Sequence, residues 1–208
     1  MMPINVCYDS GLTKVEADAV IEGMEEFCQV FPGRIYFNYG SGTWCRGDYS
    51  SADWYINHAG VLPTKQVNAN DVLALLQNEP WQTSSPHVDV LFTGRDLSLK
   101  GMNFVFGVAR PSARVTVQSV YRYRNLPMNE RKLAIKTVVQ HELGHILGCA
   151  HPGREKTEMN LGSHCTQYGC IMQQGLTVEA FVEHAKAARA LHRLYCPLCL
   201  AEARRSNI

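Results

Sequence analysis

Residues 129–151 have the sequence NERKLAIKTVVQHELGHILGCAH, and this stretch contains no proline. Its apolar residues recur every three to four positions, which predicts a long buried helix from Asn129, as N-cap, to Gly148. His141 and His145 lie four residues apart, about 400° around that helix, so both imidazoles project from one face. The sequence therefore predicts that the two rings bind one metal ion.

A third ligand is expected just beyond this helix. Gly148 can adopt the left-handed conformation that reverses the chain, and this would bring His151 to the metal. Three protein ligands leave a fourth position for water, as in catalytic zinc sites. Glu142 is then placed to accept a proton from that water and to deliver it to the leaving amine. The alternative is an amphipathic helix with ordinary hydrogen-bonded histidines. However, the motif H-E-x-x-H-x-x-G-x-x-H of residues 141–151 fixes five residues, and such a match rarely arises by chance.

The chain has eight cysteines. Four form two close pairs, which predicts a closed tetrahedral zinc site with a structural role: Cys165, Cys170, Cys196 and Cys199. A disulfide pair or free buried thiols are the alternatives. The other four are scattered and are expected as small core residues: Cys7, Cys28, Cys45 and Cys149.

With Met172 two residues after Cys170, this combination of motifs resembles the archaemetzincins, a family of metzincin zinc peptidases. The strand pair that precedes the active-site helix is similar as well, in Asn103-Phe-Val-Phe-Gly107 and Arg114-Val-Thr-Val117, so the resemblance covers residues 88–199. It implies a compact metzincin fold, peptide-bond hydrolysis, and two zinc ions, one catalytic and one structural. It also implies that Met172 is the Met-turn residue beneath the catalytic metal.

The sequence departs from the family pattern after His151. In the family the first cysteine directly follows the third histidine, whereas here residues 152–164 intervene, and His164 itself precedes Cys165. The third ligand is therefore either His151, which the spacing after Gly148 favours, or His164. The polar, glycine-containing insert is expected as a surface loop at the cleft.

The pattern of the whole chain predicts an α/β (α+β) fold in a single catalytic domain, residues 1–208. Residues 1–148 would form an N-terminal subdomain with a mixed twisted sheet and the active-site helix. Residues 149–208 would form a smaller subdomain with the Met-turn, the cysteine site and a C-terminal helix.

Strands are expected over residues 4–8, 34–39, 88–93, 104–109 and 115–120, with an irregular loop over residues 40–67. Helices are expected from the capping box Thr13-Lys-Val-Glu16 to Pro32, over residues 69–77, over residues 129–148, and from Thr177 to Cys196-Pro197.

Composition limits the partners. The 20 Lys and Arg residues nearly balance 19 Asp and Glu, so the net charge of +1 provides no broad field for nucleic acid or anionic lipid. The start of the sequence has no signal-peptide pattern, and no apolar run approaches the roughly 20 residues of a spanning helix. We expect a cytoplasmic monomer with a peptide or protein substrate and with neither nucleic-acid nor membrane partners. The competing hypothesis is a non-catalytic or latent zinc protein that acts in protein or nucleic-acid interaction, against which the intact Glu142 argues.

Overall fold

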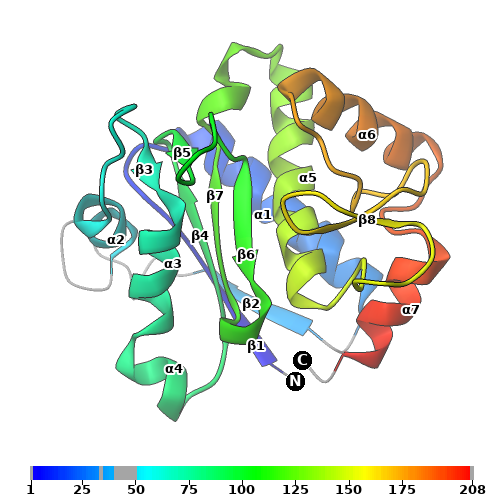
Figure 1. Ribbon diagram of the computed structural model, residues 1–208, viewed down its shortest axis with the longest axis horizontal. Coiled ribbons are helices and arrows are strands. Elements are labelled where there is room, and N and C mark those ends of the chain that lie inside the picture. Colours follow the sequence, from blue (N-terminus) through cyan, green and yellow to red (C-terminus); the bar gives the residue numbers. More distant parts are fainter. Residues whose placement is uncertain (1, 33–34, 40–50, 207–208) are drawn as a thin grey trace.

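The computed structural model describes residues 2–32, 35–39 and 51–206, which form a central sheet between two groups of helices (Figure 1). The sheet has the order β2-β1-β4-β7-β6. Its strands are β1 (Met2–Tyr8), β2 (Ile35–Tyr39), β4 (Val88–Thr93), β6 (Gly107–Arg110) and β7 (Val115–Ser119). The edge strand β6 is antiparallel to β7, and the other pairs are parallel, so the predicted mixed sheet is confirmed.

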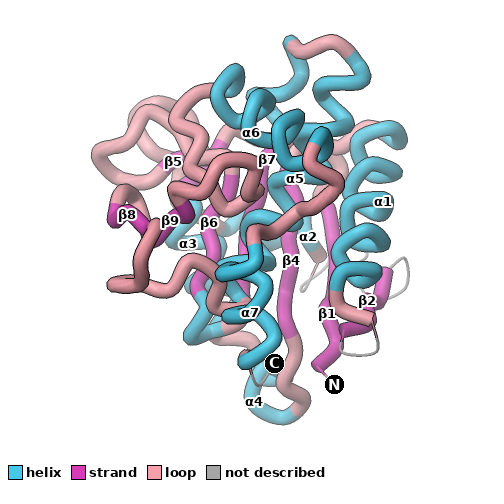
Figure 2. Tube along the Cα trace, turned by 90° about the vertical axis from the view of Figure 1, so that its right-hand side faces the viewer, coloured by secondary structure: helices cyan, strands magenta, loops and turns pink. Residues whose placement is uncertain are grey.

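The helices lie on both sides of this sheet (Figure 1). One side carries α2 (Ala52–His58), α3 (Ala69–Gln77) and α4 (Pro80–Ser84). The other side, which faces the viewer in Figure 2, carries α1 (Lys14–Val30), α5 (Met128–Ile146), α6 (Val178–Ala190) and α7 (Pro197–Arg205). Two short sheets pair β3 (Val67–Asn68) with β5 (Leu97–Ser98), and β8 (Thr157–Met159) with β9 (Ser163–Cys165). Two 3₁₀ turns, η1 (Pro111–Ala113) and η2 (Tyr121–Asn125), flank β7.

Helix α1 packs against helix α5, which carries the histidine motif. It begins at the predicted capping box, in which the Thr13 side chain accepts from the backbone of Glu16 and the Glu16 side chain accepts from the backbone of Thr13. The helices meet closely at Gly23, where an added Cβ would lie 2.9 Å from Lys136 Cα. The second half of α5 is consequently buried and held in a fixed position.

The described residues differ from the predicted elements at several boundaries. The predicted loop over residues 40–67 contains α2, while residues 40–50 lie outside the described part. The strand expected over residues 104–109 begins three residues later, as β6, because Val105 instead pairs with Leu97 in an isolated bridge. Helix α6 ends at Ala190, and Pro197 begins the further helix α7, since proline fits the first turn of a helix. Asn129 is not an N-cap, because α5 already begins at Met128.

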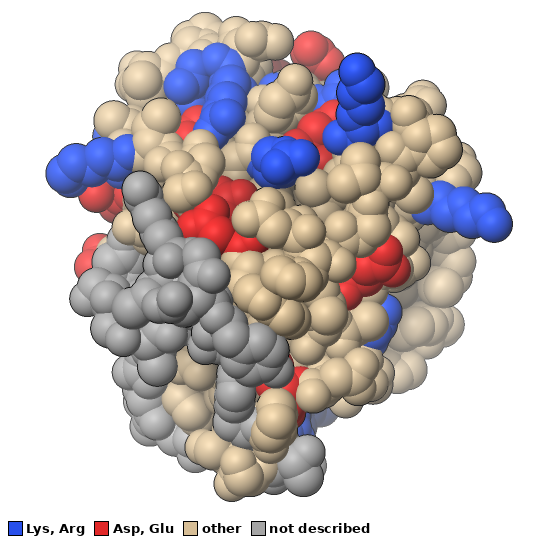
Figure 3. All heavy atoms as spheres, turned by 90° about the vertical axis from the view of Figure 1, so that its left-hand side faces the viewer, with Lys and Arg blue, Asp and Glu red and all other residues tan. Residues whose placement is uncertain are grey.

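The surface agrees with the balanced charge of the chain. On the face that carries α2 and α3, acidic and basic side chains are scattered among uncharged ones (Figure 3). None of the helices in the described ranges is long and apolar enough to cross a membrane.

Candidate metal centre and cleft

The two histidines of α5 converge as their spacing predicts. Their Nε2 atoms lie 3.2 Å apart. The Nδ1 atom of His141 is 2.6 Å from the carbonyl oxygen of Ile171, so Nδ1 donates and the lone pair of Nε2 is directed to the other ring. Two nitrogens bound tetrahedrally to one zinc ion would be about 3.4 Å apart. The pair therefore fits a shared metal ion.

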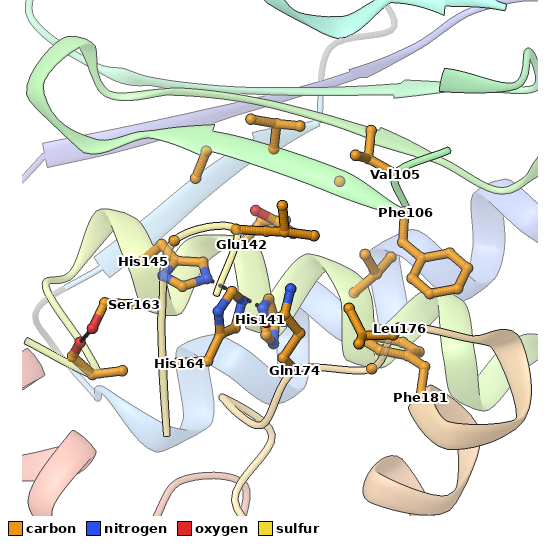
Figure 4. Close-up of a pocket in the computed structure, with 18 of the residues that line it drawn as sticks. Val105, Phe106, His141, Glu142, His145, Ser163, His164, Gln174, Leu176 and Phe181 are labelled. Carbon is orange, nitrogen blue, oxygen red and sulfur yellow. Dashed lines mark hydrogen bonds between the residues drawn. The ribbon is translucent and has the colours of Figure 1, made fainter. Parts of the chain in front are cut away.

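His164 on β9 completes this group (Figure 4). Its ring centroid lies 5.3 Å from that of His141 and 5.0 Å from that of His145, and one ligand atom from each of the three lies within 4.8 Å of the others. His164 is buried, and its Nδ1 has no hydrogen-bond partner among the described residues. A buried, unpartnered imidazole nitrogen beside two converging ones is what a metal ligand would present.

His151 lies outside this group, contrary to the expectation from its spacing. It is exposed, and its Nδ1 contacts the neighbouring carbonyl oxygen of Pro152 at 2.8 Å. The chain does turn at Gly148, with φ of 75°, and again at Ala150, with φ of 57°. These turns bring the backbone of residues 150 and 151 to the carboxylate of Glu202 on α7, which accepts both N–H groups. The helix end is thus fixed to α7, and His151 lies exposed at the cleft, outside the group of three histidines.

Glu142 faces the edge strand from the same helix. Its side chain is buried, and burial raises the pKa of the carboxyl group to about 8. A cation at the three histidines would oppose this shift by favouring the carboxylate. Burial lowers the pKa of His141 to about 3, so this ring is neutral at physiological pH, as a metal ligand must be.

Met172 packs against helix α5 at Gly144, which lies between His141 and His145 in the sequence. Its side chain is fully buried against Gly144, at which an added Cβ would collide with the Met172 sulfur and lie 3.1 Å from Tyr195 Cε1. The flanking backbone holds it there: the carbonyl oxygen of Met172 accepts from Cys165, and Ile171 N–H donates to Leu194. The loop of Met172 is therefore fixed both to α5 and to the strand that carries His164.

A cleft of about 680 Å³ opens along β6 and α5, with the three histidines in it. Beyond the histidines, one wall of the cleft is apolar and is formed by Phe106, Leu176 and Phe181 (Figure 4). Because β6 is the last strand of the sheet, its outer edge has no strand partner among the described residues. Such an edge can bind an extended chain by main-chain hydrogen bonds.

The four paired cysteines form a second buried cluster, with their sulfur atoms within 4.8 Å of one another. The Sγ atoms of Cys165 and Cys196 are 3.7 Å apart, as are those of Cys170 and Cys199. A disulfide requires about 2.05 Å, whereas two thiolates on one tetrahedral zinc ion lie about 3.8 Å apart. Backbone N–H groups also donate to two of the sulfurs, at 3.4 Å each. The cluster fits a zinc ion and not a disulfide pair.

Of the remaining cysteines, Cys149 adjoins the cysteine cluster, where its Sγ donates to the carbonyl oxygen of Cys199 at 3.4 Å. Cys7 and Cys149 are buried and Cys28 is half-buried, and all three are free thiols. Cys45 lies outside the described residues.

Sequence reasoning missed Arg154, which comes from the polar insert. Its guanidinium donates from Nη2 to Cys199 Sγ at 3.0 Å, and its Nε lies 2.7 Å from Glu202 Oε1. The insert therefore folds back onto the cysteine cluster and α7. No local pattern could have indicated this contact, because it joins residues 45 positions apart.

Comparisons with known proteins agree with this geometry. A model of metallo-peptidase family M12 matches residues 44–181. An archaemetzincin of Pyrococcus horikoshii is 32% identical over 146 residues, which are 66% of this chain and 74% of that protein. An archaemetzincin of Thermococcus kodakarensis is 39% identical over 90 residues, 40% of this chain and only 41% of that protein. The crystal structure of archaemetzincin from Methanopyrus kandleri superimposes with a TM-score of 0.71 at 20% identity, covering 99% of this chain and 94% of the other.

The fold and the histidine motif thus define a metallo-peptidase of the M12 class. Within that class, the chain belongs to the archaemetzincin family.

Proposed function

We propose that this protein is a zinc peptidase that cleaves peptide bonds in the cleft beside β6. The catalytic zinc would be held by His141, His145 and His164. The observation that carries this proposal is the convergence of these three imidazoles, one half-buried and two buried, next to a buried glutamate. A second zinc ion would be held by the four cysteines and would stabilise the fold.

The chemistry follows from the positions of the side chains. When bound, zinc polarises the scissile carbonyl and lowers the pKa of water to about 7. Glu142 Oε1 or Oε2 accepts the proton of the attacking water and passes it to the nitrogen of the leaving amine. The rings of His141 and His145 are held by their positions on α5 and, for His141, by burial and by the carbonyl group of Ile171. Met172 would support the helix that carries the two histidines, through its packing against Gly144.

An extended peptide is the substrate that fits the cleft. The outer edge of β6 would pair with its backbone through main-chain hydrogen bonds. The apolar wall of Phe106, Leu176 and Phe181 would receive a bulky apolar side chain next to the cleaved bond. The two subdomains divided at residue 148, the monomeric state and the cytoplasmic location stay predictions.

The test uses the zinc-loaded protein and a mixed peptide library. Glu142→Ala should keep both zinc ions and lose cleavage by about 10²- to 10⁴-fold, because only the proton transfer is removed. Glu155→Ala, an exposed glutamate on the insert, serves as the matched control and should leave cleavage unchanged. Equal activity of Glu142→Ala and the wild type would sink the mechanism. If the zinc-loaded wild type cleaves no peptide, the latent or non-catalytic hypothesis is favoured.

A further inference from the structure

A third cluster of metal-ligating side chains lies on the opposite face of the sheet. Glu79 follows α3, His87 precedes β4, and Asp89 lies within β4. All three are buried, with 3%, 4% and 0% of their surfaces exposed, and one ligand atom from each lies within 4.8 Å of the others. Val88 and Val90 pack with α5, so alternation along the strand directs Asp89 toward the α2 and α3 side. This cluster is therefore separated from the three histidines by the sheet.

The ring of His87 is oriented as a metal ligand would be. Its Nδ1 is 2.6 Å from the carbonyl oxygen of Ser85, which repeats the contact between His141 and Ile171. A backbone carbonyl at Nδ1 holds the proton there and leaves the lone pair on Nε2. This Nε2 is 3.1 Å from Asp89 Oδ1, yet neither atom forms a hydrogen bond with any described residue. The two atoms are close but not aligned with each other, as expected when both point to a third atom.

The two carboxylates are anchored by polar neighbours. Gln82 Nε2 donates to Asp89 Oδ2 at 2.5 Å, and the hydroxyl group of Tyr55 donates to Glu79 Oε1. These contacts use one oxygen of each carboxylate and fix the side chain in place. Side chains of metal sites are commonly held in this manner by an outer set of hydrogen bonds.

The charge of the cluster also favours a bound cation, because its two carboxylates outnumber its one imidazole. Two carboxylates are buried beside one imidazole, and His87 is the only basic side chain within ion-pair distance of Asp89 among the described residues. Buried carboxylates are costly unless they are paired or coordinate a metal. One imidazole nitrogen and two carboxylate oxygens suit a divalent transition metal. None of the three residues lines the cleft beside β6.

We propose that Glu79, His87 and Asp89 bind a divalent transition-metal ion that joins the segment after α3 to the start of β4. The ion's role is structural, because it links side chains from the end of α3 and from β4. This site is independent of the proposed peptidase activity. It gives the protein three metal ions in place of two.

The experiment counts bound metal in the full-length protein after dialysis against zinc. The wild type should hold three equivalents, and His87→Ala should hold two, with a lower melting temperature. His58→Ala, an exposed histidine on the same side of the sheet, is the matched control and should hold three. A wild-type content of two equivalents would overturn the proposal, and this measurement needs no variant.

Two further comparisons separate this site from the others. The side chain of Asp89→Asn has the same shape as that of the wild type and keeps one acceptor oxygen, so this variant should fold even if His87→Ala does not. It should also hold two equivalents of metal. His164→Ala and Cys199→Ser should each lose one equivalent and should keep the ion at Glu79, His87 and Asp89. If Asp89→Asn retains all three ions, the third ion binds elsewhere and the proposal is wrong. Loss of cleavage without loss of the third ion would concern only the peptidase function.

Discussion

The carboxyl group of Glu142 packs directly against the backbone of Gly107 on the edge strand. A Cβ atom at position 107 would lie 2.7 Å from Glu142 Oε1 and 2.8 Å from its Cδ, closer than real contacts allow. Glycine therefore lets the proposed general base lie at the strand that the substrate would pair with. Any side chain at position 107 would displace the carboxyl group.

Gly107→Ala should lower kcat/KM by about 10²-fold while the zinc content stays at the wild-type level, because a displacement near 1 Å disrupts a reacting geometry. Peptide cleavage and metal analysis of the same preparation check this. Arg110→Ala on the same strand is the control, since its guanidinium contacts Gln77 and not Glu142. Unchanged cleavage by Gly107→Ala would mean that Glu142 is not held in this position during catalysis.

The sequence predicted what depends on local spacing. The four-residue interval of His141 and His145, the capping box at Thr13 and the strand of residues 88–93 are each fixed by neighbours along the chain, and the structure has them as expected. For the third histidine the spacing favoured His151 and left His164 as the alternative, because the choice depends on how the chain continues beyond Gly148. Two residues with positive φ and the carboxylate of Glu202 direct that continuation, and none of these contacts is visible in the spacing.

The cluster of Glu79, His87 and Asp89 shows the same limit. Asp89 is read from the sequence as one residue of a buried strand, and nothing near it indicates a ligand. Only the packing of the segment after α3 against β4 brings Glu79 to it. Long-range contacts of this kind follow from the tertiary fold and not from local pattern.

His164→Ala should remove the catalytic zinc and peptide cleavage, whereas His151→Ala should retain both, because only His164 lies with the other two rings. His151 is the matched control by residue type. Zinc content of the two purified variants, measured together with their circular dichroism spectra, distinguishes the assignments. Loss of zinc in His151→Ala alone would restore the assignment based on spacing.

Gly144→Ala should destabilise the protein by about 1–3 kcal/mol, because the added methyl group collides with Met172 in a closely packed core. Met172→Ala opens space at the same place, so the double variant should be more stable than the sum of the two single effects predicts. Chemical denaturation of the four proteins gives the coupling. Strict additivity would show that Met172 does not limit the space above Gly144.

Stability below pH 5 should depend on Glu16. Burial by itself would raise the pKa of this carboxyl group, but the Arg124 guanidinium and the backbone N–H of Thr13 outweigh burial and lower the pKa below its usual value. A lowered folded-state pKa contributes stability above the unfolded-state pKa of about 4.3, and this contribution is lost as the pH falls through the folded-state value. The unfolding free energy of the wild type should therefore fall more between pH 5 and pH 3 than that of Glu16→Gln. The unfolding free energy of Glu25→Gln, a variant at an exposed glutamate, should depend on pH as that of the wild type does. The same pH dependence in all three proteins would show that Glu16 is not the source of the lost stability.

Arg154→Ala should weaken zinc at the cysteine cluster without removing any ligand. The guanidinium donates to Cys199 Sγ and is paired with Glu202, so it offsets the negative charge of four thiolates on one zinc ion. Loss of a hydrogen-bond partner behind a metal ligand typically costs about 10–100-fold in affinity. The measurement is competition of the folded protein with a chelator, with release followed separately for the two proposed zinc ions. Arg205→Ala, an exposed arginine on α7, is the control for a simple loss of positive charge.

Because His164 and Cys165 are adjacent on β9, slow loss of the cysteine-bound zinc should be followed by loss of cleavage. Loss of cleavage before any zinc is released would show instead that the insert acts on the cleft directly.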